Sequence, residues 1–175
     1  LKEVRLGFDC STVEDRARHT LKVEDCRLTG PDLIEITLAA RLIDTDDEFW
    51  RSIDEADPFG LLGTKAALAS ARLMVVDKSL LQRSLQAKAR LSGQPVAAER
   101  AALATEIRRY QPPGVLITQD MSKVLDAVAR FVEQGGTLIL DAAPQPALGL
   151  EKLDYLLKPG ADLVNALGLT ATVSR

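Results

Sequence analysis

The sequence predicts an α+β domain, in which a small antiparallel sheet is packed by several amphipathic helices. Two observations support this fold class. Residues with strand-like alternation of apolar and polar side chains fill the first part of the chain, and helical apolar spacing follows later. The elements do not alternate regularly as βαβ units, which argues against a doubly wound parallel sheet. A chain of 175 residues can bury one sizeable core, so we expect residues 1–175 to form a single α+β domain.

Three strands are expected at the start of the chain. Val4, Leu6 and Phe8 alternate with other residues, and the polar run 11–19 ends this first pattern. In the second strand the side-chain parity changes near Asp25, which a β-bulge would explain. The expected elements are a strand from Val4 to Phe8, a strand over 21–28, a turn over 29–32 and a strand over 34–42.

The middle of the chain predicts helices around a fourth strand. Phe49 and Trp50 lie at helical spacing in an acidic segment, and Pro95 suits the first turn of a helix. The expected elements are a short helix within 44–57 ended by Pro58-Phe59-Gly60, a strand over 67–76, a helix capped by Asp77 or Ser79 and stopped by Gly93, and a helix over 96–110.

The last third predicts one long helix and two strands. Val124, Leu125, Val128, Phe131 and Val132 share one face of the helix. The expected elements are this helix, capped by Asp120 or Ser122 and closed by Gly135-Gly136, a strand over 137–143 that Pro144 and Pro146 confine to an edge or to an early exit, short helices over 150–157 and 161–167, and a strand over 169–173.

Cys10 and Cys26 are the two cysteines of the chain. A hairpin centred near Arg18 would place them opposite each other within bridging distance. Closing this loop would contribute roughly 3 kcal/mol on the chain-entropy model. The alternative is a pair of reduced thiols in a cytoplasmic core.

Charge and motifs exclude several classes of function. The net charge is −3 and the basic residues are dispersed, so no nucleic-acid footprint is visible. No apolar stretch approaches the roughly 20 residues of a membrane span. Phosphate-binding loops and nucleophile elbows are absent from the sequence, so we assign no catalytic residue and no cofactor.

A metal site is not predicted either. His19 is the only histidine and has no partner at ligand spacing. The acidic cluster Asp44, Asp46, Asp47 and Glu48 lacks the spacing of a calcium loop, and its carboxylates suit a helix N-terminus instead.

The segments 71–83 and 131–146, with helices between them, resemble uncharacterised envelope proteins of proteobacteria. The resemblance extends over Ile34 to Val173 and is looser to the β-groove modules of AsmA-like lipid-handling proteins. It implies a periplasmic location and contact with lipid, and it names no functional residue. The chain begins with Leu1, so we also expect a processed protein or the C-terminal part of a longer exported one.

Three functions follow as hypotheses. The first is a non-enzymatic envelope domain that binds a lipid or protein partner through an apolar interface between sheet and helices. The second is a small hydrolase or transferase with dispersed carboxylates, such as Asp77, Asp120 and Asp141. The third is a structural module in which a free sheet edge or the helical hairpin 79–110 joins another copy. A cytoplasmic location is the alternative to the periplasm.

Overall fold

The computed structural model describes residues 5–111, 117–152 and 162–174. It has the expected α+β fold, with one sheet of seven strands in the described residues. Six strands follow one another in the order β1-β2-β3-β4-β5-β7, β6 pairs with β4 outside this path, and every pair is antiparallel. The strands are β1 (Gly7–Asp15), β2 (Thr20–Gly30), β3 (Ile34–Ile43), β4 (Ala67–Asp77), β5 (Gly136–Ala142), β6 (Leu148–Gly149) and β7 (Leu169–Ser174).

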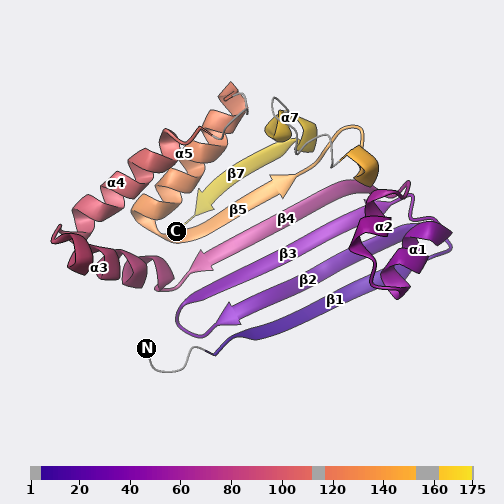
Figure 1. Cartoon of the computed structure of the whole chain (residues 1–175), viewed down its shortest axis with the longest axis horizontal. Coiled ribbons are helices and arrows are strands. Elements are labelled where there is room, and N and C mark those ends of the chain that lie inside the picture. Colours follow the sequence, from indigo (N-terminus) through magenta and orange to yellow (C-terminus); the bar gives the residue numbers. More distant parts are fainter. Residues whose placement is uncertain (1–4, 112–116, 153–161, 175) are drawn as a thin grey trace.

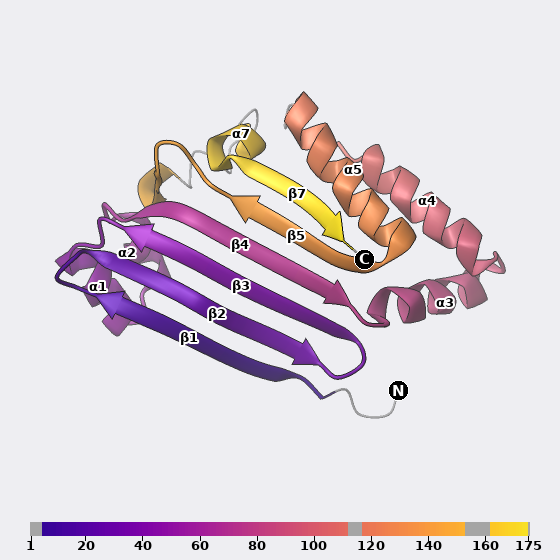
Figure 2. The same ribbon diagram turned by 180° about the vertical axis from the view of Figure 1, so that it is seen from behind.

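The helices lie at the two ends and at one edge of this sheet, with α3 beyond the end of β4 opposite to α1 and α2 (Figures 1 and 2). α1 and α2 lie together at one end of β1–β4, whereas α5 lies against β5 and β7 and α4 lies against α5. The helices are α1 (Asp47–Asp54), α2 (Pro58–Leu62), α3 (Leu80–Ser92), α4 (Val96–Arg108), α5 (Gln119–Gln134), the 3₁₀ helix η1 (Leu150–Lys152) and α7 (Leu163–Leu167).

The first strand differs from the sequence-based expectation. β1 continues through the polar residues from Ser11 to Asp15, where we expected it to have ended, and Val4 lies outside the described residues. The reason is its place at the sheet edge, where both faces meet solvent and no apolar alternation is needed. The bulge predicted near Asp25 is confirmed, because the β2 register shifts between Val23 and Cys26.

The start of α5 required correction, whereas that of α3 lies at the residues expected to cap it. Thr118, rather than Asp120 or Ser122, caps α5, and its side chain accepts a hydrogen bond from the Met121 amide at 3.3 Å. Ser79 occupies the N-cap position of α3, but the carboxylate of Asp77 accepts the hydrogen bond from the Leu81 amide at 2.9 Å. A side chain just upstream can reach the free amides of a first turn from more than one position, so the sequence alone did not identify it.

Prolines mark boundaries that were predicted in part. Pro58 does not only end the preceding helix, since it starts the short helix α2. Pro95 is the N-cap residue of α4. β5 leaves the sheet early before Pro144, but it lies between β4 and β7 and is not an edge strand. Of the helix expected over 150–157, Leu150–Lys152 is a 3₁₀ turn and residues 153–161 lie outside the described part.

The core consists of separate clusters beneath the helices. One is formed at the end of the sheet by Phe49 and Trp50 of α1 with Leu21 and Ala66. A second joins α4 to α5 through Ala104, Ala129 and Val132, and a third surrounds Leu148 next to α7. Because these clusters lie under helices, the central and outer parts of β1–β3 are left without a covering layer in the described structure.

Candidate functional site

One face of the sheet carries rows of apolar side chains that cross six strands. Residues that pair across a sheet point to the same face, and alternate residues along a strand share that face. Following the register from β1 to β7 gives three such rows without a charged side chain. They are Phe8, Leu28, Ile36, Val75, Leu138 and Val173; Cys10, Cys26, Leu38, Leu73, Leu140 and Ala171; and Thr12, Val23, Ala40, Ala71, Ala142 and Leu169.

The β5 and β7 end of these rows is covered by α5. Leu138 and Ala142 of β5 are buried. On β7 the row residue Ala171 is half-buried, whereas its neighbours Thr170 and Thr172 on the opposite face are exposed. α5 therefore packs on the apolar side of the sheet, where it covers β7 and β5.

The remainder of the three rows has no helix above it among the described residues (Figure 2). Phe8 is 73% exposed and Leu38, in the middle of β3, is 42% exposed. We call this surface the apolar face. It consists of Phe8, Cys10, Thr12, Val23, Cys26, Leu28, Ile36, Leu38, Ala40, Ala71, Leu73 and Val75.

The opposite face of the same strands is polar and paired. Arg27 contacts Asp25 at 2.7 Å, and Arg72 contacts Asp141 on the neighbouring strand at 2.6 Å. The hydrogen bond that Arg72 donates to Asp141 is the main cause of a raised pKa of Arg72. Ion pairs thus occupy one face of the sheet, whereas the twelve residues of the apolar face carry no charge, so the two faces differ sharply in what they can bind.

Cys10 and Cys26 form a disulfide in the structure and face each other across β1 and β2, as the hairpin predicted. The two residues belong to the second row of the apolar face. The bridge therefore ties the edge strand to the sheet within the apolar face itself. Extracytoplasmic compartments favour such bonds, whereas the cytosol keeps thiols reduced.

Hollows adjoin the sheet at several places, and two of them bear on the expected groove. A hollow of about 530 Å³ is lined by Lys22, Arg41, Arg72 and Asp141 of the polar face, and by Ala40, Ala71 and Ala142. A second, of about 350 Å³, lies between α5, α7 and β7, with Val124 and Leu169 among its lining residues. The second is the described counterpart of the groove expected between sheet and helices, and it is the smaller of the two.

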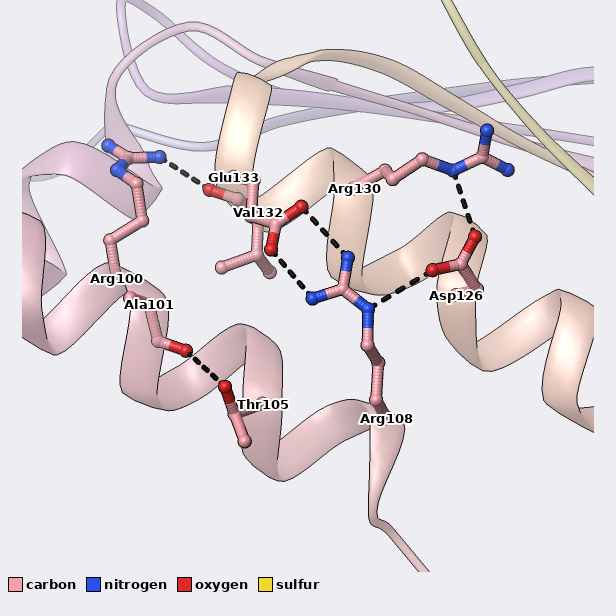
Figure 3. Close-up of polar contacts among 8 residues, drawn as sticks. All are labelled: Arg100, Ala101, Thr105, Arg108, Asp126, Arg130, Val132 and Glu133. Atoms are coloured by element: carbon pink, nitrogen blue, oxygen red, sulfur yellow. Dashed lines mark hydrogen bonds and ion pairs between the residues drawn. The ribbon is translucent and has the colours of Figure 1, made fainter.

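An ion-pair network holds α4 on α5 (Figure 3). Arg108 donates two hydrogen bonds to Glu133, at 2.6 and 2.9 Å, and one to Asp126 at 3.1 Å. Asp126 also pairs with Arg130 at 3.2 Å. These hydrogen bonds raise the pKa of Arg108 and lower the pKa of Glu133. All four charges are partnered inside the helical layer, so we assign the network to helix docking rather than to a reaction.

The carboxylates considered for catalysis have separate structural roles. Asp77 caps α3, Asp120 pairs with Lys123 one turn later in α5, and Asp141 pairs with Arg72 across two strands. Asp77 lies opposite Gly136 at the start of β5, and Asp141 lies five residues further along that strand. At about 3.3 Å per residue this separates them by roughly 16 Å, so the structure does not bring these two together.

The histidine and the acidic cluster are also accounted for. The Nδ1 atom of His19 lies 3.0 Å from the carbonyl oxygen of Thr45, and Asp46 caps α1 by accepting a hydrogen bond from the Phe49 amide at 2.9 Å. Within the described ranges, no cluster of three or more metal-binding side chains is found. Across the same ranges, no helix combines the length and the apolar character of a membrane span.

Sequence reasoning found Cys10 and Cys26 but not the apolar face as a unit. The signal was present, because each strand has its apolar residues at every second position. Assembling the rows requires the register between strands, and the β2 bulge at 24–25 shifts that register by one residue. Knowing that the face is uncovered requires the positions of the helices.

Comparison with known proteins places the fold in a family. No curated protein and no solved structure matches the chain. A family model described as "Uncharacterized protein" matches residues 27–174, which include β3 to β7 and every helix of the described residues. The match extends over most of the chain, and the protein therefore belongs to this uncharacterised family.

Proposed function

We propose that this protein is a non-enzymatic domain of the bacterial cell envelope that binds the acyl chains of a lipid on its apolar face. The observation that carries the proposal is the exposed continuation of the three apolar rows over β1–β4, beyond the part that α5 covers. Contiguous exposed apolar surface of this kind marks interaction sites in proteins.

The chemistry of the face favours an acyl chain over a protein partner. Among its residues, Thr12 alone carries a hydroxyl group and none carries a charge or an amide side chain. A protein interface typically contains about one hydrogen bond per 100–200 Å², which this face offers few groups to make. An acyl chain needs none, and it gains from each CH₂ group removed from water.

The envelope location is supported by two features. The disulfide between Cys10 and Cys26 is of the kind that forms and persists in oxidising compartments. The resemblance to proteobacterial envelope proteins points in the same direction. Trapping free thiols with an alkylating mass tag in intact cells would test this part of the proposal. Unmodified, bridged cysteines are expected, and tagged thiols on both residues would place the protein in a reducing compartment.

Lipid binding can be tested with a fatty acid that carries a photoactivatable diazirine. After irradiation, labelled peptides from β1, β3 and β4 are expected. Phe8→Glu and Leu38→Glu place a carboxylate on the face and should weaken binding of the fatty acid by roughly tenfold or more, because a charge beside an acyl chain loses solvation.

Leu91→Glu is the matched control for these variants. Leu91 is 90% exposed at the end of α3, away from the apolar face, so the same substitution there should leave binding unchanged. Equal weakening by Leu91→Glu, labelling confined to the helices, or no uptake of the fatty acid would each contradict the proposal. A protein partner would then become the better explanation of the exposed face.

A further inference from the structure

The edge strand β1 has an unusual degree of exposure. Of its nine residues, Asp15 alone is half-buried and the other eight are exposed. Figure 1 shows no element of the described chain beside its outer edge. The outward-facing amide and carbonyl groups of this strand therefore have no strand partner within the described residues.

Edge strands of natural proteins are normally protected against pairing with other chains. The usual devices are short length, charged side chains and above all lysine, proline, β-bulges or a covering element. β1 has nine residues and contains neither lysine nor proline. Phe8 lies on it, and Leu6 just before it is 63% exposed, so the edge is long and carries apolar side chains. Such an edge is a suitable template for an added strand.

The charges of β1 define the strand that fits. Asp9, Glu14 and Asp15 are its only charged residues. Glu14 lies 3.7 Å from Arg16, and Asp15 lies 3.7 Å from Arg18. Asp9 is the carboxylate of β1 that takes part in none of the ion pairs found among the described residues, and it points to the face opposite Phe8.

A second copy of the chain is a poor partner for this edge. Antiparallel self-pairing centred on Ser11 would place Asp9 opposite Val13 and Phe8 opposite Glu14. Each carboxylate would then lie opposite an apolar residue or a glycine, so self-pairing sets six carboxylates along one seam and brings no cation beside Asp9. A strand with cationic side chains on one face and apolar side chains on the other would instead pair with Asp9 and extend the row that begins at Phe8.

We propose that β1 is a docking edge for a partner strand in which cationic and apolar residues alternate. The added strand pairs its backbone with the outer edge of β1, sets a cationic side chain beside Asp9, and widens the apolar face by one strand. This inference concerns the backbone edge and does not depend on whether the apolar face binds lipid.

The test uses fluorescently labelled peptides of about eight residues, the length of an ordinary strand. One alternates Lys and Val, one alternates Glu and Val, and a third is the Lys-Val peptide with N-methyl groups on alternate residues, which blocks backbone pairing. Fluorescence anisotropy with the full chain should show binding of the Lys-Val peptide. N-methylation should abolish it.

Charge exchange at Asp9 separates this edge from the rest of the surface. Asp9→Lys should weaken binding of the Lys-Val peptide about fivefold or more and strengthen binding of the Glu-Val peptide, a gain that misfolding cannot produce. Glu106→Lys, an equal charge change on the exposed surface of α4, should alter neither affinity. The proposal would be overturned if the N-methylated peptide bound, if Asp9→Lys left both affinities unchanged, or if no peptide bound. Self-association of the chain through β1 would also overturn it.

Discussion

The guanidinium group of Arg16 lies over the ring of Trp50, with its carbon atom 4.8 Å from the ring centroid. The same group pairs with Asp54 at 3.2 Å, and this hydrogen bond is the main cause of a raised pKa of Arg16. Arg16 begins the turn between β1 and β2, whereas Trp50 and Asp54 belong to α1. One side chain thus fastens the tip of the outer hairpin to the first helix.

Arg16→Gln should loosen this attachment. The variant loses both the cation over Trp50 and the ion pair with Asp54, so we expect a lower urea midpoint and a change in Trp50 fluorescence. Arg16→Lys keeps the charge but not the planar guanidinium group. Its urea midpoint should lie between those of the wild type and Arg16→Gln. A fluorescence spectrum identical to that of the wild type in Arg16→Gln would contradict this role.

Removing the disulfide should destabilise the protein. The bridge closes a separation of 16 residues between Cys10 and Cys26, so the Cys10→Ser/Cys26→Ser variant should lose on the order of 3 kcal/mol in the free energy of unfolding. Urea denaturation with and without a reducing agent measures the difference. Reduction should lower the stability of the wild type and leave that of the double variant unaffected. A wild type whose stability does not change on reduction would exclude the bridge.

Truncation of two phenylalanines ten residues apart should change stability by very different amounts. Phe49 is 1% exposed in the cluster with Trp50, and Phe49→Ala should cost about 3–5 kcal/mol through lost burial and the cavity that remains. Phe59 is 83% exposed on α2, and Phe59→Ala should change stability by about 0.5 kcal/mol or less. Comparable losses in both variants would contradict the packing described at this end of the sheet.

The ion pair between Arg108 and Glu133 predicts a pH dependence of stability. Because Arg108 lowers the pKa of Glu133 from its ordinary value of 4.5, the folded state favours the carboxylate form. Its contribution should be fully present above that value and should be lost as the pH falls through the lowered pKa. The wild type should therefore exceed Glu133→Gln in urea midpoint near neutral pH, with a gap that narrows in acid. A gap that does not change with pH would point to packing instead.

Local patterns in the sequence predicted much of the fold but not its arrangement. The alternation in Ile34–Leu42 and the apolar spacing from Val124 to Val132 depend on burial of one face, and both elements formed as expected. β6 has only two residues and is held by pairing with Ala67 and Leu68, so no local period could reveal it. The partnership of Arg108 with Glu133 depends on two helices meeting, which charge spacing within either helix does not encode.

The candidate site shows the same division. The position of the cysteines in two adjoining strands was enough to predict their pairing, because a hairpin turn fixes which residues oppose each other. Alternating apolar residues, in contrast, predict that a strand has an apolar side. They do not predict which element covers that side. The sequence therefore led us to expect an interface between sheet and helices, while the structure leaves the apolar face beside the helices.

The separation of the helices from the outer strands has a consequence for how the molecule opens. Where α5 packs on β5 and β7, backbone amides are enclosed by two layers, whereas those of β1 and β2 beyond the end covered by α1 are shielded by one sheet alone. Amide hydrogens of the outer hairpin should therefore exchange with solvent through local fraying, and those of β5 only through global unfolding. The part of the sheet best placed to meet a ligand is thus also the part whose backbone can yield to it without unfolding the rest.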